Sequence, residues 1–277
     1  MNNPRVNFWL EKIARFLPFG RKKSRVHLPA LTDETTEAQE LWWGTFSIEE
    51  EQSRFFKIGN IVICVDRFHH KWHITTYREG EQPFKTFAAQ TSNEIHLKPA
   101  LPDRALLSQL DRPIYIPVGK TVLIYISSPL WIRIEAGNPS TLLDEFATET
   151  LADTWFGKNT LDGEICYANH IQGSPRLEDL PRETTHVITP VSIENRSRET
   201  LLLQELKIPL PYLSIYSDKQ NHLWTDQLNI YQEDPRYIET VVVQSPPLPL
   251  KDIHCITTPR LVSKPGFKNL FSPFMWK

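Results

Sequence analysis

Side-chain character alternates along the middle of this chain, and that alternation restricts the folds open to it. Between Pro113 and Gly137, three short runs alternate apolar and polar residues, with breaks at residues 117–119 and 127–129. In the last run, every second residue is apolar and the residues between them are largely polar. The apolar positions are Leu130, Ile132, Ile134 and Ala136, and the others are Trp131, Arg133 and Glu135. A period of two residues is the geometry of a pleated strand with one buried face. Because similar runs recur along most of the chain, we predict a mostly β protein, an antiparallel β-sandwich built as one or as two packed β-units.

The composition is that of a globular protein and argues against a nucleotide-binding enzyme. Of the 277 residues, 40% are hydrophobic and 23% are charged, which is typical of globular domains. The 10 glycines fall below the roughly 19 that average usage gives, so few positions allow close backbone approach to a phosphate. The 22 prolines exceed the expected ~14 and suit edge strands and turns.

Cysteine usage and hydropathy indicate a cytoplasmic protein. Cys64, Cys166 and Cys255 are far apart and odd in number, which disfavours a disulfide framework and favours a reducing compartment. No segment approaches the ~20 consecutive apolar residues of a spanning helix. Charged residues from Glu11 to Arg15 also interrupt any signal-peptide run. We expect neither a cofactor nor a bound metal.

Charge is concentrated at the two ends of the chain. Residues 1–27 carry seven basic residues and one acidic residue, a charge of +6, whereas the remainder carries 24 basic and 32 acidic residues, a charge of −8. No acidic residue follows Asp252, and both ends are also rich in aromatic residues. We expect these basic and aromatic residues to contact a partner or a membrane: Trp9, Lys12, Arg15, Phe16, Phe19, Arg21, Lys22, Lys23, Arg25, Lys264, Phe267, Lys268, Phe271, Phe274 and Trp276.

The first residues predict a short amphipathic helix. Asn3 suits an N-cap and Pro4 the first helical position. An apolar stripe follows at helical spacing: Val6, Trp9, Leu10, Ile13, Phe16 and Leu17. Three surfaces would cover this stripe: the β-body or a partner chain, an anionic membrane surface attracted by the basic run 21–25, or nucleic acid. The acidic body disfavours nucleic acid.

The chain divides into five segments. Residues 1–27 form the basic arm, 28–40 a polar linker, 41–111 a first β-unit, 112–245 a second β-sandwich unit, and 246–277 a Pro-rich and then basic-aromatic tail that we expect to be extended. Gly59 marks a bulge or a tight turn, and residues 68–71 a hairpin connection. Residues 141–151 suit either strand or helix. We predict strands at residues 41–48, 54–66, 72–78, 95–98, 164–170, 186–194, 200–208, 212–216, 222–231 and 237–243.

Several short segments resemble a known family. They are Trp43-Gly44, Ile58-Gly59-Asn60, Trp72, Leu97-Lys98-Pro99, residues 128–132, residues 155–167, residues 190–195 and residues 213–216. Together they resemble a family of prokaryotic proteins catalogued as domain of unknown function, family 432. The resemblance implies a domain over about residues 41–245 with both basic ends outside it. It carries no catalytic residue and no activity.

His69, His70 and His73 form the most metal-like group in the sequence. Two histidines four residues apart converge on one ion when they lie on a helix face. These surroundings are strand-like, so His69 and His73 share a face and His70 points across it. We interpret the group as a solvated hairpin rather than a metal site.

Cys166 and His170 suggest a nucleophile and its base. Four residues along a strand span roughly 13 Å, too far for a direct hydrogen bond. We interpret Cys166 as a small buried residue.

Two groups of charged residues remain. Arg133 and Glu135 share a strand face and predict a cross-strand ion-pair ladder, or alternatively a ligand groove together with Trp131. A dense acidic patch lies beside Trp155 and Phe156: Asp144, Glu145, Glu149 and Asp153. Paired carboxylates act as acid and base in glycosidases. Phosphate-loop, dinucleotide, zinc-protease and serine-elbow motifs are absent from the sequence.

We therefore expect a non-enzymatic binding or assembly module, peripheral to the inner face of a membrane or docked on a membrane-protein partner through its ends. The alternative is a carboxylate-dependent enzyme acting on a polar, sugar-like substrate.

Overall fold

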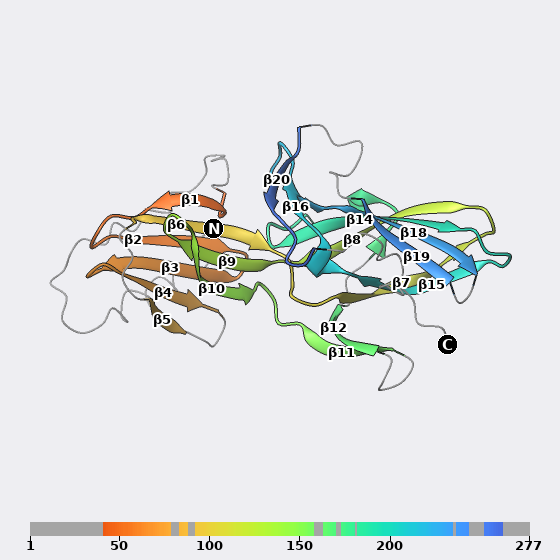
Figure 1. Cartoon of the computed structure of the whole chain (residues 1–277), viewed down its shortest axis with the longest axis horizontal. Coiled ribbons are helices and arrows are strands. Elements are labelled where there is room, and N and C mark those ends of the chain that lie inside the picture. Colours follow the sequence, from red (N-terminus) through yellow and green to blue (C-terminus); the bar gives the residue numbers. More distant parts are fainter. Residues whose placement is uncertain are drawn as a thin grey trace, which may run out of the picture. The chain divides into compact units, whose positions relative to one another are not determined.

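The computed structural model describes residues 41–78, 83–87, 92–157, 163–169, 173–180, 182–234, 237–243 and 252–262. The predicted N-terminal helix and linker lie outside these residues. The described residues, which begin at Leu41, belong to one compact unit. Its described residues are mostly in strands, which confirms the predicted fold class (Figure 1). Two short 3₁₀ turns interrupt them, η1 (Leu177–Asp179) and η2 (Leu210–Tyr212).

The first sheet is an antiparallel meander joined by tight turns. Its strands, in order, are β2 (Ser53–Ile58), β3 (Ile61–Phe68), β4 (Lys71–Tyr77) and β5 (Phe84–Phe87). Gly59, with a φ of 57°, begins the β2–β3 connection, so it marks a tight turn and not a bulge. His69 and His70 connect β3 to β4 with φ angles of 51° and 56°. Two successive positive φ angles are typical of a type I′ hairpin turn, which confirms the predicted hairpin.

The second sheet contains the strand that the alternating run predicts. Its order is β1 (Gly44–Ser47), β6 (Glu94–Ala100), β9 (Trp131–Ala136) and β10 (Thr141–Ala147), all antiparallel. The ambiguous segment 141–151 therefore begins as a strand. On β9, Ile132, Ile134 and Ala136 are completely buried while the alternate side chains are half-buried.

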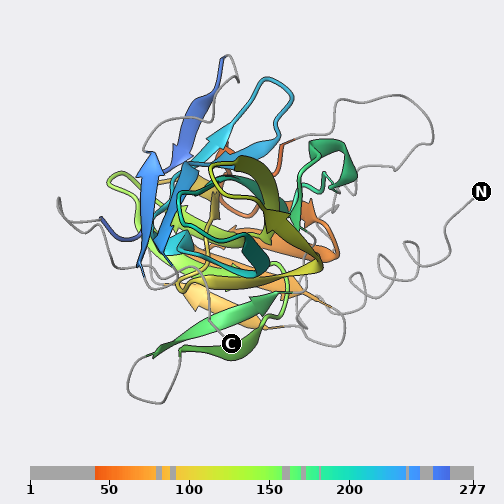
Figure 2. The ribbon, with the colours of Figure 1, turned by 90° about the vertical axis from the view of Figure 1, so that its right-hand side faces the viewer.

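The third sheet carries a peripheral hairpin. Its order is β11 (Ala152–Gly157), β12 (Gly163–Asn169), β7 (Leu106–Ile116) and β15 (Leu201–Ile208). β12 pairs with β7 in parallel, one of the exceptions to the expected antiparallel pairing. The β11–β12 hairpin lies at the edge of the body both in Figure 1 and in the perpendicular view of Figure 2.

The fourth sheet is the largest. Its main path is β13 (Gly173–Ser174), β8 (Thr121–Pro129), β14 (His186–Asn195), β17 (Leu223–Thr225), β16 (Ile215–Ser217) and β20 (His254–Thr257). Strand β18 (Gln227–Asp234) also pairs with β14, and β19 (Tyr237–Val243) pairs with β18. Both β17 and β18 run parallel to β14.

Three details of this sheet differ from the sequence-based expectation. The strand predicted over residues 212–216 begins in the 3₁₀ turn η2 and is a strand only from Ile215 on. The strand predicted over residues 222–231 is broken at Asp226, whose buried carboxylate accepts hydrogen bonds from Ser214 N and the Tyr216 hydroxyl. Within the segment predicted to be an extended tail, β20 pairs with β16.

Two long strand runs pass from one sheet to another. β8 continues into β9 with only Leu130 between them, and β6 leads to β7 through residues 101–105 (Figure 1). Arg112, where the sequence analysis divides the two β-units, lies inside β7. One continuous hydrophobic core includes residues of all four sheets.

This core predicts a large cost for truncating Ile132. The side chain is completely buried on β9, so Ile132→Ala should lower the free energy of unfolding by about 2–5 kcal/mol, measured by urea denaturation. Leu142→Ala, on the adjacent strand β10 but 50% exposed, is the control and should change it by less than about 0.5 kcal/mol. Equal losses in the two variants would contradict the assigned face of β9.

Candidate functional site

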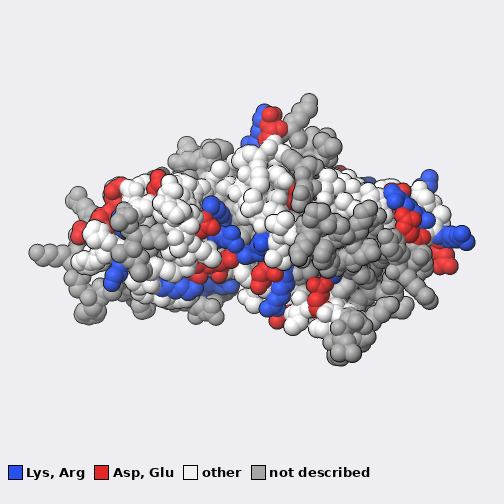
Figure 3. All heavy atoms as spheres, viewed as in Figure 1, with Lys and Arg blue, Asp and Glu red and all other residues white. Residues whose placement is uncertain are grey.

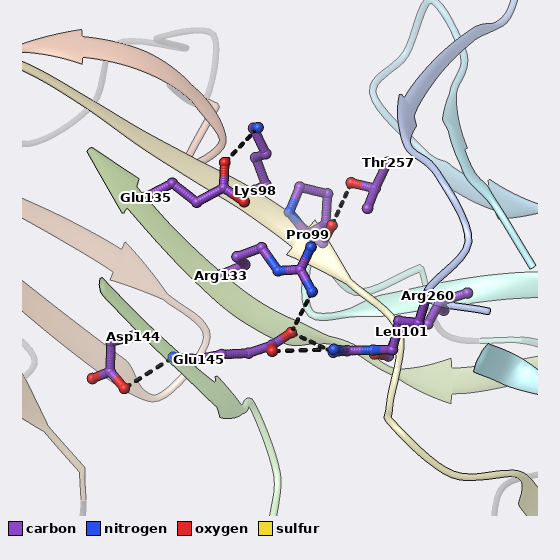
Figure 4. A network of polar contacts seen from close by, with 9 residues as sticks. All are labelled: Lys98, Pro99, Leu101, Arg133, Glu135, Asp144, Glu145, Thr257 and Arg260. Carbon is purple, nitrogen blue, oxygen red and sulfur yellow. Dashed lines mark hydrogen bonds and ion pairs between the residues drawn. The ribbon is translucent and has the colours of Figure 1, made fainter. Parts of the chain in front are cut away.

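The outward face of β9 carries the three residues that the sequence singled out as a ladder or a groove. Trp131, Arg133 and Glu135 all lie on this face, half-buried. Figure 4 shows that the side chains of β6, β10 and the C-terminal segment surround the two charged members.

Glu135 is paired across the strands. Its carboxylate accepts a hydrogen bond from Lys98 Nζ on β6 at 2.7 Å and another from the Ser140 hydroxyl. Partial burial alone raises the pKa of Glu135, but the hydrogen bonds from Lys98 and Ser140 and the nearby positive charges outweigh it and lower the pKa. Glu135 is therefore a stabilised carboxylate and a poor general acid or base at neutral pH.

Arg133 and Glu145 form the second rung, directly opposite each other on β9 and β10 at 3.4 Å. Arg260, from the C-terminal segment, contacts both carboxylate oxygens of the same Glu145 (Figure 4). Arg260 Nε also donates to the carbonyl of Leu101 at 2.6 Å. The predicted ion-pair ladder is thus present, and one carboxylate holds two arginines from distant parts of the chain.

The C-terminal segment is fixed to the body at several points. The Thr257 hydroxyl donates to the Pro99 carbonyl at 2.6 Å, and Leu261 N donates to the Pro211 carbonyl at 2.9 Å. With Arg260 and the β16–β20 pairing, these bonds anchor residues 252–262. We call this segment the C-terminal strap.

Aromatic side chains extend the site beyond the ladder. The Arg260 guanidinium lies 5.4 Å from the Trp131 ring centroid, and the Trp131 and Tyr167 rings are 6.4 Å apart. The Tyr167 hydroxyl donates to Asp103 at 2.7 Å. Burial and this hydrogen bond raise the pKa of Tyr167 to about 12, so it is protonated at neutral pH. The cluster is a set of structural contacts around β9.

The structure does not bring the acidic patch together as an acid–base pair. Asp144 pairs with Lys85 at 2.7 Å and Glu145 with the two arginines. Asp153 pairs with Arg104 at 3.0 Å. Glu149 lies instead beside His186, at 3.5 Å. Asp144, Glu145 and Asp153 are thus paired with different Lys or Arg side chains, and of the two aromatic residues beside the patch, Phe156 is buried and Trp155 exposed.

The histidine group is also separated. His69 and His70 form the hairpin turn, and His73 Nδ1 lies 3.0 Å from the Thr86 hydroxyl with its ring stacked on Phe84. None of the three belongs to a metal-ligand cluster among the described residues.

Cys166 is completely buried, as predicted, while His170 lies outside the described residues. Burial, with a smaller contribution from Glu164, raises the pKa of the Cys166 thiol to about 11. A thiol with this pKa is almost entirely protonated at neutral pH and is a weak nucleophile.

The residues predicted to bind a partner or a membrane, from Trp9 to Arg25 and from Lys264 to Trp276, lie outside the described residues. On the face of the body drawn in Figure 3, described Lys and Arg side chains lie among Asp and Glu side chains. The described residues contain no helix that is long and apolar enough to cross a membrane.

Sequence reasoning missed Arg260 and Lys98 as members of the ladder. Lys98 alternates with the buried residues of β6, and this alternation predicts that its side chain lies on the outward face of the sheet. Arg260 is 115 residues from Glu145, and no periodic pattern in the sequence connects the two.

A family model described as protein of unknown function (DUF432) matches residues 42–275. The chain belongs to this family. The match reaches 30 residues beyond the expected end at residue 245, so it includes the strap and most of the basic C-terminal end. No curated protein and no solved structure matches the chain. Membership of DUF432 assigns no activity to the chain.

The strap contacts predict that Arg260→Ala destabilises the body. The side chain is largely buried and makes charge-assisted hydrogen bonds to Glu145 and Leu101. Its loss should lower the free energy of unfolding by about 1–3 kcal/mol in urea denaturation. Arg196→Ala is the control, because Arg196, like Arg260, forms carboxylate ion pairs (here with two glutamates) and lies over an aromatic ring, but it is exposed. The free energy of unfolding of the Arg196→Ala variant should equal that of the unmodified protein within error. A larger loss in Arg196→Ala than in Arg260→Ala would refute the stabilising role of the strap.

Cysteine labelling tests the burial of the thiols. Cys64 and Cys166 are buried and Cys255 is exposed. Iodoacetamide at neutral pH should label Cys255 in the native protein, and all three thiols only after denaturation, as read by mass spectrometry. Cys255→Ser should remove the native labelling. Rapid native labelling of Cys166 would restore the nucleophile hypothesis.

Proposed function

We propose that this DUF432 protein is a non-enzymatic binding or assembly module, docked through its basic aromatic ends on an anionic membrane surface or on a membrane protein at the cytoplasmic face. The N-terminal residues carry a charge of +6 in a chain whose net charge is −2. Basic residues interleaved with Trp and Phe favour both anionic headgroups and aromatic-rich protein interfaces.

The observation that carries this proposal is the position of the strap. Arg260 and Leu261 are bonded to the body immediately before the basic aromatic residues 264–277 begin. When a docking segment begins directly after a fixed point of the body, its binding also holds the body at the same surface. Such a segment also loses less conformational entropy on binding than one attached through a long flexible linker. The family match extends through this segment to residue 275, which supports a shared use.

The enzyme alternative receives no comparable support. An enzyme of this kind needs two carboxyl groups close to one substrate, one protonated as the general acid and one ionised as the base or nucleophile. Asp144, Glu145 and Asp153 each pair with a different cation. The body therefore serves in this proposal as a rigid carrier for its ends.

Vesicle co-sedimentation tests the docking ends. The full-length protein should bind vesicles of phosphatidylserine and phosphatidylcholine more than pure phosphatidylcholine vesicles, and binding should fall with added salt. Replacing Arg21, Lys22, Lys23 and Arg25 with Gln should reduce binding strongly, since each charge near an anionic surface contributes about 1 kcal/mol.

A matched control keeps the number of removed charges constant. Arg112, Lys57, Lys71 and Lys120 are exposed residues of the body, and their replacement with Gln should leave vesicle binding unchanged. If both quadruple variants keep full binding, residues 21–25 are not the lipid-binding segment. If the full-length protein shows no preference for the anionic vesicles, lipid is not the surface. A pull-down from source cells in mild detergent then tests the protein partner. Retention of the same partners after substitution of both basic ends would refute the proposal.

A further inference from the structure

A second polar cluster lies where β8 passes into β9. Glu149, Glu183 and His186 each place one potential ligand atom so that the three atoms lie within 4.8 Å of one another. Glu149 follows β10, Glu183 precedes β14, and His186 is the first residue of β14. From this cluster we infer that the protein has a binding site for a divalent transition-metal ion of the Zn²⁺ class.

One of the two contacts of His186 has the separation that metal coordination requires. His186 Nε2 is 3.5 Å from Glu149 Oε1, and His186 Nδ1 is 3.5 Å from Glu183 Oε2. A strong charge-assisted hydrogen bond is about 2.7–2.9 Å long, as in the Lys85–Asp144 pair at 2.7 Å. Two ligands of a tetrahedral zinc, each about 2.0–2.1 Å from the ion, are about 3.4 Å apart. An ion bound at Nε2 uses only the separation from Nε2 to Glu149 Oε1, and this separation is close to one edge of a zinc tetrahedron.

The surroundings orient the imidazole for this role. Nδ1 lies 3.1 Å from the Thr185 hydroxyl, and metal-binding histidines commonly use their second ring nitrogen for such a hydrogen bond. Nε2 and Glu149 then form the first edge of the site. The Glu183 side chain is 57% exposed and is held only by contacts of 3.5 Å, a hydrogen bond from the Thr185 hydroxyl and the contact with His186 Nδ1, so its carboxylate can turn toward the ion at little cost.

The backbone that carries these residues is already fixed. Leu130 N donates to the Thr185 carbonyl at 2.9 Å, while Thr148 donates to the Leu130 carbonyl through both its N–H and its hydroxyl. The Trp42 indole donates to the Thr184 carbonyl at 3.1 Å. Segments before and after the strand crossing are thus held together independently of any ion, which reduces the ordering cost of binding.

The ligand set also defines the ion. One imidazole and two carboxylates suit zinc and neighbouring transition metals better than Mg²⁺, which is bound mainly through oxygen atoms and water. Two carboxylates would balance the charge of a divalent ion, and a water molecule would complete four-coordination. The competing arrangement is a protonated His186 between two glutamates, which binds no metal.

Isothermal titration with ZnCl₂ distinguishes the two arrangements. The full chain carrying Cys255→Ser, which removes the exposed thiol, should take up a single Zn²⁺ with a matching rise in melting temperature. The double variant Glu149→Gln/Glu183→Gln should lose more than about 100-fold in affinity, because changes outside the ligand shell alone cost about 10–100-fold. Both glutamates are exposed, so this isosteric variant should still fold.

Two controls and one further variant complete the test. His70→Gln and Glu178→Gln change an exposed histidine and an exposed glutamate outside the cluster and should leave the titration unchanged. His186→Gln should abolish it. No zinc uptake by the full chain, or uptake that persists in the double-glutamine variant, would overturn the inference.

Discussion

The structure depends on one constraint: the buried backbone N–H and C=O groups must be hydrogen-bonded at the places where a strand passes from one sheet to another. Peptide groups removed from water must find hydrogen-bond partners, and at a sheet crossing the ladder cannot supply them. Leu130, completely buried between β8 and β9, bonds to the Thr185 carbonyl and to Thr148. Leu101, buried after β6, has its carbonyl bonded to Arg260. The loops and the C-terminal strap thus pack against the sheet crossings because they supply hydrogen-bond partners for the buried backbone groups there.

This requirement explains why the polar residues of the body gather around β9. The strap that supplies Arg260 also brings its charge to Glu145, and Glu145 in turn positions Arg133. At the other crossing, the loops that satisfy Leu130 bring Glu149 close to His186. In the first cluster, Glu145 binds Arg260 through both carboxylate oxygens, so this cluster is structural. In the second cluster, both glutamates are exposed and each contacts His186 at 3.5 Å, which is the arrangement on which the proposed metal site rests.

Local patterns predicted much of this fold, because strand pairing leaves a local signature. The parity of Ile132 and Ile134 identified the buried face of β9, and His69-His70 identified a hairpin. Asp226 shows where local patterns fail. Its buried carboxylate accepts hydrogen bonds from Ser214 N and the Tyr216 hydroxyl, and this interrupts the strand that the apolar pattern predicted as continuous. The Arg260–Glu145 pair and the Glu149–His186 contact join residues far apart in sequence, and no periodicity encodes such contacts.

The two basic ends differ in their relation to the rest of the chain. The family match begins at residue 42 and continues to residue 275, so the C-terminal end belongs to the same unit as the sheets. The hydrogen bonds of Thr257 and Arg260 give a physical reason, since the carbonyls of Pro99 and Leu101 use this segment as their partner. Loss of the strap would leave the buried Leu101 carbonyl unpaired, a cost that the body bears whether or not a partner is bound. The arm over residues 1–27 lies before the match, so the family model includes only the C-terminal one of the two ends that we propose for docking.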